Sequence, residues 1–178
     1  FELMLHHGIL DGVVPEERDL DCLKSVVGAE QALGLSDALR RNVALLPKDI
    51  NVIWDVCKRL KLSNKEIKRA KSMVGNDVHV HNALSEDEAH AALYYLGKEI
   101  FLDRLLLSAG GHDVSDLYHL GKTWVAPHLP INGRDLLSHG LAQGPDVGAV
   151  LRTLEREWVQ SGFQLSRDQL LKKADHGS

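Results

Sequence analysis

The sequence predicts an all-α protein, a compact bundle of about eight to ten helices with no significant β-sheet. Apolar residues recur at helical spacing along the 178 residues, and capping residues, glycines and prolines bound these segments. Aromatic residues make up only 5% of the chain, and leucine and alanine supply much of its apolar content, which favours helix packing. A chain of this length buries roughly 70% of its unfolded surface. Residues 1–178 are therefore predicted to form a single domain.

The first half of the chain reads as four helical segments. Gly8 and Gly34 end the first two, because glycine readily closes a helix C-terminus. Ser36 is the predicted cap of the third segment, and Pro47 ends it. These segments are predicted at residues 1–7, 19–33, 36–46 and 49–60.

Three capping boxes mark further helix starts, since Ser followed three residues later by Glu or Gln satisfies two backbone N–H groups at once. They are Ser63–Glu66, Ser85–Glu88 and Ser166–Gln169. The helix that starts at Ser85 is predicted to run through Gly97 to Ala109, where Gly110-Gly111 ends it. Pro145 takes a first-turn position. The remaining helices are predicted near residues 113–124, 134–139, 145–160 and 166–173.

A run near the C-terminal end carries a family resemblance. It reads Pro130-Ile131-Asn132-Gly133-Arg134-Asp135-Leu136-Leu137, then Gly140, then Gly144-Pro145-Asp146-Val147-Gly148. It resembles the Gly-Arg/Lys-Asp-Leu…Gly…Gly-Pro-x-hydrophobic-Gly run of the bacterial class II CCA-adding tRNA nucleotidyltransferases and their poly(A) polymerase relatives. Four earlier segments are similar to other signatures of this family, in the same order. They are Phe1–Glu16, Arg40–Asp49, Arg59–Asn64 and Tyr95–Leu107.

The resemblance implies that the chain is the C-terminal region of a longer nucleotidyltransferase. Residues 1–16 would end the neck helices, residues 17–125 would form the body, and residues 126–178 the body and tail. The implied function is non-catalytic: to bind tRNA or other RNA and position its 3′ end for nucleotide addition. Mg²⁺ and NTP are expected only in an N-terminal catalytic head domain, so no cofactor is expected here and the chain alone is expected to be inactive. CCA addition and poly(A) synthesis are not separated by these residues.

Positive charge is concentrated in one stretch, although the net charge of the chain is −4. Residues 58–71 hold seven Lys or Arg residues against Glu66 alone, a local charge of +6. Lys65, Lys68 and Arg69 share one helix face by their spacing. Such a face can contact phosphates, and the alternative is an ordinary solvated helix surface. The resemblance favours RNA. The predicted RNA-binding residues are Lys58, Arg59, Lys61, Lys65, Lys68, Arg69 and, at the Asn132-Gly133 turn, Arg134.

Stacking on unpaired bases is not predicted, because no aromatic residue lies within the basic stretch. Trp54, Trp124 and Trp158 are assigned to core packing. The glycine-and-asparagine turn before Arg134 is instead expected to offer backbone N–H groups to a phosphate, with a purely structural turn as the equal alternative.

No catalytic or metal-binding residue is predicted. Asp19-Leu20-Asp21 imitates the metal-binding Asp-x-Asp of the family, but it opens a predicted helix, where acidic residues favour the helix dipole. Glu86-Asp87-x-x-His90 imitates the Glu-Asp-x-x-Arg motif of the family, but it ends in His and stands far downstream of the place of that motif. His112-Asp113 is the dipeptide of HD-type metal-dependent phosphohydrolases, and an independent helical hydrolase of that type is the alternative function. Against it, Asp113 is a plausible helix N-cap, and the ten histidines lack the spacing of metal ligands.

Cysteine content and hydropathy indicate the cellular setting. Cys22 and Cys57 are too few and too unpatterned for a disulfide framework, which favours a reducing cytoplasm. No apolar run reaches the ~20 residues that a membrane-spanning helix needs. A cytoplasmic protein with no membrane association is therefore predicted.

Overall fold

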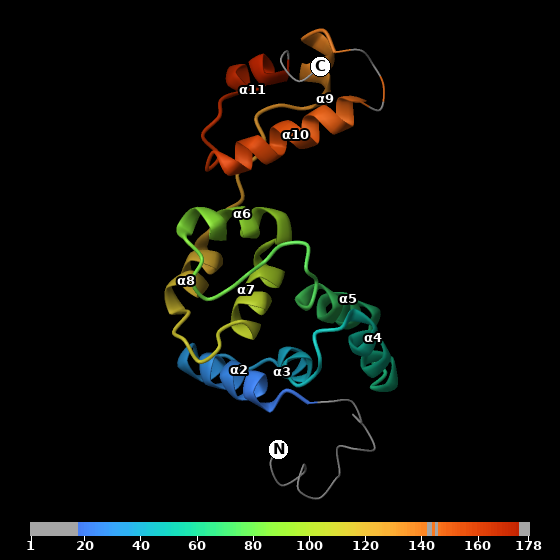
Figure 1. The fold of residues 1–178 in the computed structure, drawn as a ribbon, viewed down its shortest axis with the longest axis vertical. Coiled ribbons are helices and arrows are strands. Elements are labelled where there is room, and N and C mark those ends of the chain that lie inside the picture. Colours follow the sequence, from blue (N-terminus) through green and yellow to red (C-terminus); the bar gives the residue numbers. More distant parts are fainter. Residues whose placement is uncertain (1–17, 142–143, 145, 175–178) are drawn as a thin grey trace, which may run out of the picture. The chain divides into compact units, whose positions relative to one another are not determined.

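The computed structural model describes residues 18–141, 144 and 146–174. Within these residues the chain forms ten helices and no strand (Figure 1), which confirms the all-α prediction. The predicted neck segment 1–16, with Gly8, and the first-turn Pro145 lie outside the described residues. The helices are α2 (Leu20–Ala32), α3 (Ala38–Ala44), α4 (Ile50–Arg59), α5 (Asn64–Met73), α6 (Glu86–Leu96), α7 (Lys98–Leu107), α8 (Ser115–Thr123), α9 (Gly133–Ser138), α10 (Asp146–Gln160) and α11 (Arg167–Ala174).

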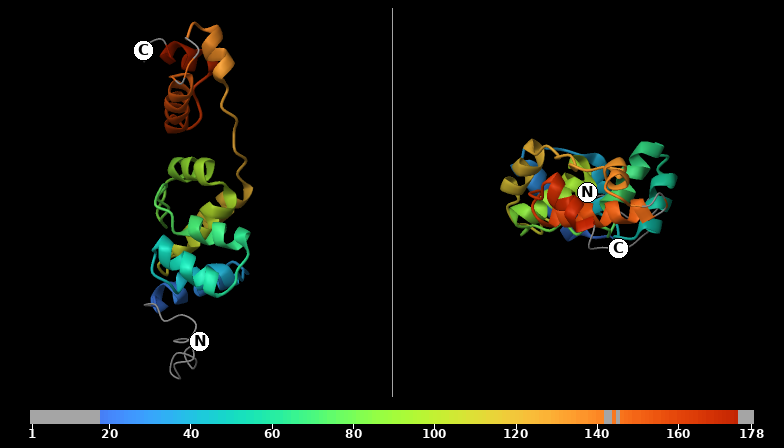
Figure 2. Two further views of the ribbon diagram at one scale, coloured as in Figure 1. Left: turned by 90° about the vertical axis from the view of Figure 1, so that its right-hand side faces the viewer. Right: turned by 90° about the horizontal axis from the view of Figure 1, so that it is seen from above.

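The chain divides into two compact units, Phe1–Trp124 and Val125–Ser178. The first holds helices α2 to α8 and the second holds α9 to α11. Residues 124–132, between α8 and α9, contain no helical residue (Figure 2). That residues 1–178 form a single domain stays a prediction. None of the described helices is both long enough and apolar enough to cross a membrane.

Helix α7 is the centre of the first unit. It contacts α2, α3, α5, α6 and α8, and every residue from Phe101 to Leu107 is buried. Leu107 belongs to an apolar cluster with α2 to α5, in which Val26 and Ile53 are fully buried. Phe101 and Leu105 belong to a second cluster with α6 and α8. A buried stretch of helix tolerates charged residues only where they are paired, and this condition governs Asp103 and Arg104, the two buried charged residues of α7 described below.

Gly97 divides the long helix that the sequence predicted over residues 85–109. Its φ of +75° and ψ of 161° lie in a region open essentially to glycine alone, and a helix cannot continue through it. Its N–H donates to Leu93 O and ends α6, while its carbonyl accepts from Phe101 N and starts α7. The prediction of a continuous helix was wrong because glycine was treated as a tolerated interior residue.

Most predicted helix starts are confirmed. All three serine capping boxes form, at Ser63–Glu66, Ser85–Glu88 and Ser166–Gln169. A fourth capping box joins Asn132 and Asp135 at the start of α9. The cap of α3 was assigned one residue too early, because Asp37 and not Ser36 accepts the N–H of Arg40.

The second unit packs three helices around a small core. Leu136 of α9, Leu154 and Trp158 of α10, and Leu170 of α11 are buried. The Phe163 ring meets Trp158 edge-on with ring centroids 5.0 Å apart. An ion pair between Arg167 and Asp135, at 2.9 Å, ties the start of α11 to α9.

Candidate nucleic-acid interface

The basic stretch folds as a hairpin of two helices, α4 and α5. Lys61 ends α4 with a left-handed φ of 54°, and the N–H groups of Lys61 and Leu62 donate to Lys58 O and Cys57 O. This is the six-to-one and five-to-two pattern that closes many helices. The Ser63–Glu66 capping box then starts α5. The hydroxyl and backbone N–H of Ser63 lower the pKa of Glu66, whose carboxylate is therefore committed to the cap.

Five lysines lie on this hairpin, and we call the surface that they give it the α4–α5 basic surface. They are Lys58, Lys61, Lys65, Lys68 and Lys71. All except the half-buried Lys71 are exposed. Within the described part of the chain, Lys61, Lys65 and Lys68 form no ion pair. Arg59 is also exposed. Lys61, Lys65 and Lys68 thus present ammonium groups that no carboxylate of the described residues pairs with.

Arg69 does not share this exposed face, and its predicted placement beside Lys65 is corrected. Its side chain is 20% exposed and turns toward α7. Its Nε and Nη2 donate to the two carboxylate oxygens of Asp103, each at 2.7 Å, and Nη2 also donates to Asp37 at 2.8 Å. The hydrogen bonds to Asp103 raise the pKa of Arg69 above its ordinary value. The spacing along α5 placed Lys65 and Arg69 on one side of the helix. Because α5 packs against α7, the Arg69 side chain reaches Asp103 of α7 instead of solvent.

The partners of Arg69 belong to a buried ionic network that joins α2, α3, α5 and α7. Arg40 donates to Asp103 at 2.9 Å and to Glu30 at 2.6 Å, and Arg41 donates to the second oxygen of Glu30 at 2.6 Å. The Glu30 and Asp103 side chains are 0% and 1% exposed. Buried charges are stable only when paired, so these arginines are structural.

Trp54 lies on the basic surface, contrary to the prediction that it packs in the core. It is 40% exposed. The Nζ atoms of Lys58 and Lys71 lie 4.6 Å and 5.0 Å from its ring centroid. No aromatic residue lies within residues 58–71, but α4 presents Trp54 one turn before Lys58. The i, i+4 spacing of Trp54 and Lys58 on one helix is the sequence signal that would have revealed this.

A groove of about 400 Å³ opens beside Trp54. It is lined by Ile50, Lys68, Lys71, Asp77 and Arg104 among others. Arg104 fixes the segment after α5, because its guanidinium donates to Ser72 O at 2.8 Å, Val78 O at 2.7 Å and Asp77 Oδ1 at 2.7 Å. The hydrogen bond from Arg104 lowers the pKa of Asp77. Arg104 thus joins the segment after α5 to α7 beside the groove.

Arg134 lies in the second unit and is exposed. The backbone N–H groups of Arg134 and Asp135 donate to Asn132 Oδ1 at 2.9 Å and 3.3 Å, which agrees with the structural one of the two interpretations of this turn. The Asp135 carboxylate also lies at this helix start and accepts the N–H of Asn132 at 2.8 Å. The backbone of this turn thus forms a helix cap. At this turn, the Arg134 side chain stays a predicted RNA contact.

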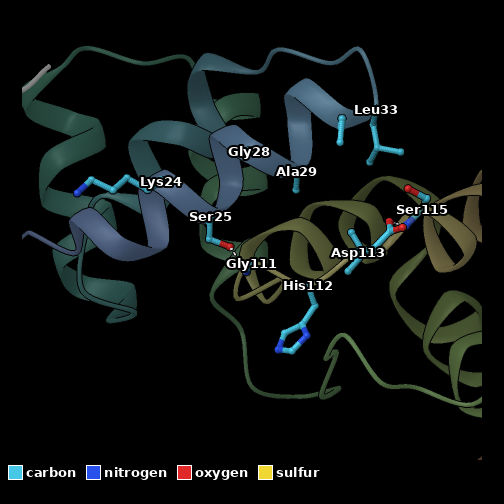
Figure 3. Close-up of a pocket in the computed structure, with 11 residues that line it drawn as sticks. Lys24, Ser25, Gly28, Ala29, Leu33, Gly111, His112, Asp113 and Ser115 are labelled. Atoms are coloured by element: carbon cyan, nitrogen blue, oxygen red, sulfur yellow. Dashed lines mark hydrogen bonds between the residues drawn. The ribbon is translucent and has the colours of Figure 1, made fainter.

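His112 and Asp113, on which the hydrolase alternative depends, line a pocket of about 360 Å³ between α2 and the start of α8 (Figure 3). The His112 ring and the Asp113 carboxylate point in different directions. Asp113 accepts the N–H of Ser115 at 2.9 Å, although Val114 is the N-cap residue of α8. Across the residues that the structure describes, no three His, Cys, Asp or Glu side chains are grouped so that they could hold a metal ion.

The two acidic motifs that imitate catalytic ones are both helix starts, as predicted. Asp19 is the N-cap of α2 and accepts the N–H of Cys22 at 2.8 Å. Glu86 lies in the first turn of α6, and its carboxylate is 3.9 Å from Nε2 of His90.

The model of the family described as tRNA nucleotidyltransferase domain 2 matches residues 45–174, a range that includes α4, α5 and the whole second unit as far as it is described. The chain belongs to this family. The match starts before the α4–α5 basic surface and ends with α11, so both predicted RNA-contact regions lie inside it.

Relatives with known names match a shorter segment. The human "CCA tRNA nucleotidyltransferase 1, mitochondrial" is 38% identical over 48 residues, which is 27% of this chain and 11% of that protein. The mouse protein of the same name is 35% identical over 48 residues, with the same two shares. The zebrafish (Danio rerio) protein is 36% identical over 50 residues, 28% of this chain and 12% of that protein. The matched part of the chain spans about a tenth of the length of these relatives.

Proposed function

We propose that this chain is an RNA-binding, non-catalytic region of a template-independent tRNA nucleotidyltransferase of the bacterial class II type. It holds tRNA so that the 3′ end reaches a catalytic domain of the same protein. The observation that carries this proposal is the α4–α5 basic surface, where Lys61, Lys65 and Lys68 have no ion-pair partner within the described residues. Membership of the family supports tRNA as the nucleic acid.

The chemistry of the surface supports binding through phosphates. An exposed lysine is a hydrated point charge, which attracts phosphate without selecting a base. Each phosphate that a lysine neutralises releases a condensed counterion, so the affinity depends on salt concentration. Such a surface positions an RNA and does not read its sequence. That property suits a region that has to accept every tRNA.

Reaction type, cofactors and location concern the whole protein. The names of the relatives favour CCA addition over poly(A) synthesis. We assign Mg²⁺ and NTP to the catalytic domain and none to this region. A cytoplasmic location also stays a proposal, and the relatives named above are mitochondrial proteins.

Charge reversal at two exposed lysines tests the proposal. We expect Lys65→Glu with Lys68→Glu to weaken tRNA binding several-fold and to flatten the slope of log K against log salt by roughly 0.7 to 0.9 for each phosphate that the lysines no longer neutralise. Folding should be unaffected, because surface changes usually cost within about 0.5 kcal/mol. Arg69 is unsuitable for this test because its reversal would break the buried network. Arg134→Ala is the corresponding test in the second unit.

The matched control reverses Lys24 and Lys122, which are exposed on two other helices of the same unit, α2 and α8. It makes the same change in net charge. Equal losses in the two double variants would mean that RNA responds to overall charge and not to this surface. Unchanged affinity and slope in Lys65→Glu/Lys68→Glu would refute the proposal that the hairpin contacts RNA.

A further inference from the structure

The side chain of Trp54 is a large aromatic ring that is partly exposed to solvent beside the lysines. It is 40% exposed, and Ile50, one turn earlier on α4, is 45% exposed. Both line the groove of about 400 Å³ described above. Large aromatic side chains dominate core and interface energetics, so an indole kept at the surface is more informative than one buried in the core. Nothing in the phosphate-binding role of Lys61 and Lys65 uses this ring.

The surroundings of Trp54 indicate what kind of ligand fits the groove. Lys58 and Lys71 place their ammonium groups 4.6 Å and 5.0 Å from the ring centroid, and Lys68 also lines the groove. Protein–protein interfaces are enriched in aromatic residues but depleted in lysine. An aromatic ring among lysines is instead the arrangement that binds single-stranded nucleic acid, in which bases stack on the ring and cations hold the backbone.

Asp77 adds a negative charge to the lining of the groove. Its carboxylate is 68% exposed and is fixed by Arg104 at 2.7 Å. A carboxylate repels phosphate, so a phosphate in the groove belongs with Lys68 and Lys71. A carboxylate also accepts hydrogen bonds from the amino groups of bases. The groove thus combines an aromatic ring, ammonium groups and one carboxylate.

We infer that the α4–α5 groove binds an unpaired nucleotide of RNA, in which the base displaces an ammonium group from over the Trp54 ring and stacks there, while Lys68 and Lys71 hold the phosphate. The inference rests on the proposed function and deepens it, because it adds a preference for unpaired over fully paired RNA. Lysines that only follow a phosphate backbone do not create this preference, since base-paired RNA carries the same phosphates.

The test compares the affinity of the full chain for a short oligo(A) strand and for a blunt RNA duplex. Trp54→Ala lowers the affinity for oligo(A) by about fivefold to a hundredfold, the effect expected for losing one stacked base. The salt slope stays unchanged, because stacking releases no counterion. Duplex affinity also stays unchanged, and Trp54→Phe, which keeps a ring, retains most of the oligo(A) affinity.

The control is Tyr95→Ala, since Tyr95 is an aromatic residue of α6 that is 49% exposed and lies outside the basic surface. It leaves the oligo(A) affinity unchanged. A second measurement avoids truncating the side chain. Oligo(A) quenches tryptophan emission in the unmodified chain, and this quenching disappears in Trp54→Phe although binding persists.

The outcomes separate this inference from the proposed function. If Trp54→Ala binds oligo(A) like the unmodified chain, or loses affinity for oligo(A) and duplex equally, the inference is wrong. If it is wrong while Lys65→Glu/Lys68→Glu still weakens tRNA binding, the phosphate-binding role stands alone. If neither set of variants changes RNA binding, both proposals fail.

Discussion

Replacing Asp103 by asparagine tests whether the buried ionic network holds the first unit together. The Asp103 carboxylate is 1% exposed and accepts hydrogen bonds from Arg40 and twice from Arg69, at 2.7 to 2.9 Å. Asparagine has nearly the same volume, so Asp103→Asn opens no cavity. Its amide nitrogen is a donor and therefore faces guanidinium donors, while the negative charge between the two arginines is lost.

The expected loss of stability depends on the partners that Arg40 and Arg69 keep. Removing one partner of a buried ion pair costs about 3–5 kcal/mol. Arg40 keeps Glu30 at 2.6 Å and Arg69 keeps Asp37 at 2.8 Å, so we expect the lower end, about 3 kcal/mol. For a chain of this size each kcal/mol lowers Tm by roughly 2–4 °C, which predicts a fall of about 6–12 °C. Urea unfolding followed by circular dichroism measures the loss of stability. The slope of the unfolding free energy against urea concentration should stay unchanged.

The control is Glu99→Gln, which removes the same charge from the same helix. Glu99 lies 3.3 Å from Nε of Arg69, but its side chain is 64% exposed. Exposed ion pairs contribute about 0–1 kcal/mol, so this variant should unfold almost like the unmodified chain. A loss in Asp103→Asn below about 1 kcal/mol, or no larger than that of Glu99→Gln, would refute the view that the network stabilises the packing of α7.

Two further predictions concern acid and catalysis. Burial raises the pKa of Asp37, but the backbone N–H of Arg40 and the guanidinium of Arg69 outweigh it and lower the pKa below its unfolded value. The stability that Asp37 contributes is therefore present above about pH 4 and lost as the pH falls through the folded-state pKa. In Asp37→Asn, the free energy of unfolding in urea should therefore fall less steeply as the pH is lowered below about 4. An equally steep fall in both proteins would contradict this. The chain alone should add no nucleotide to tRNA or oligo(A) with any NTP and Mg²⁺, because phosphoryl transfer needs carboxylates that hold metal at the phosphate. Primer extension by the purified chain would overturn that expectation.

Helix starts could be predicted from the sequence because their determinants are local. The capping boxes at Ser63, Ser85 and Ser166 each need only two side chains three residues apart. The same locality explains why Asp19 and Glu86 were correctly placed at helix starts despite their resemblance to catalytic motifs. A helix end at glycine is less certain, and Gly97 shows why. Its effect depends on whether the backbone adopts a positive φ, which the residue type permits but does not dictate.

The candidate site was only half predictable, because periodicity gives the faces of a helix but not its neighbours. Spacing placed Lys65, Lys68 and Arg69 together, yet Arg69 turns to Asp103, which lies 34 positions later in the chain. Trp54 was assigned to the core because apolar residues are buried by default. Its exposure depends on how α4 packs against α5 and on the lysines that surround the ring.

Four arginines of the first unit differ from the lysines of the α4–α5 basic surface in what they contact, and the difference follows their chemistry. Arg40, Arg41, Arg69 and Arg104 all turn their guanidinium groups to carboxylates or carbonyls of other elements. A planar guanidinium is weakly hydrated and binds two acceptors at once, which suits a buried partner. The five lysines of the α4–α5 basic surface are strongly hydrated point charges and gain nothing from burial. These arginines therefore hold the helices together, and the proposals above assign the lysines and Trp54 to RNA.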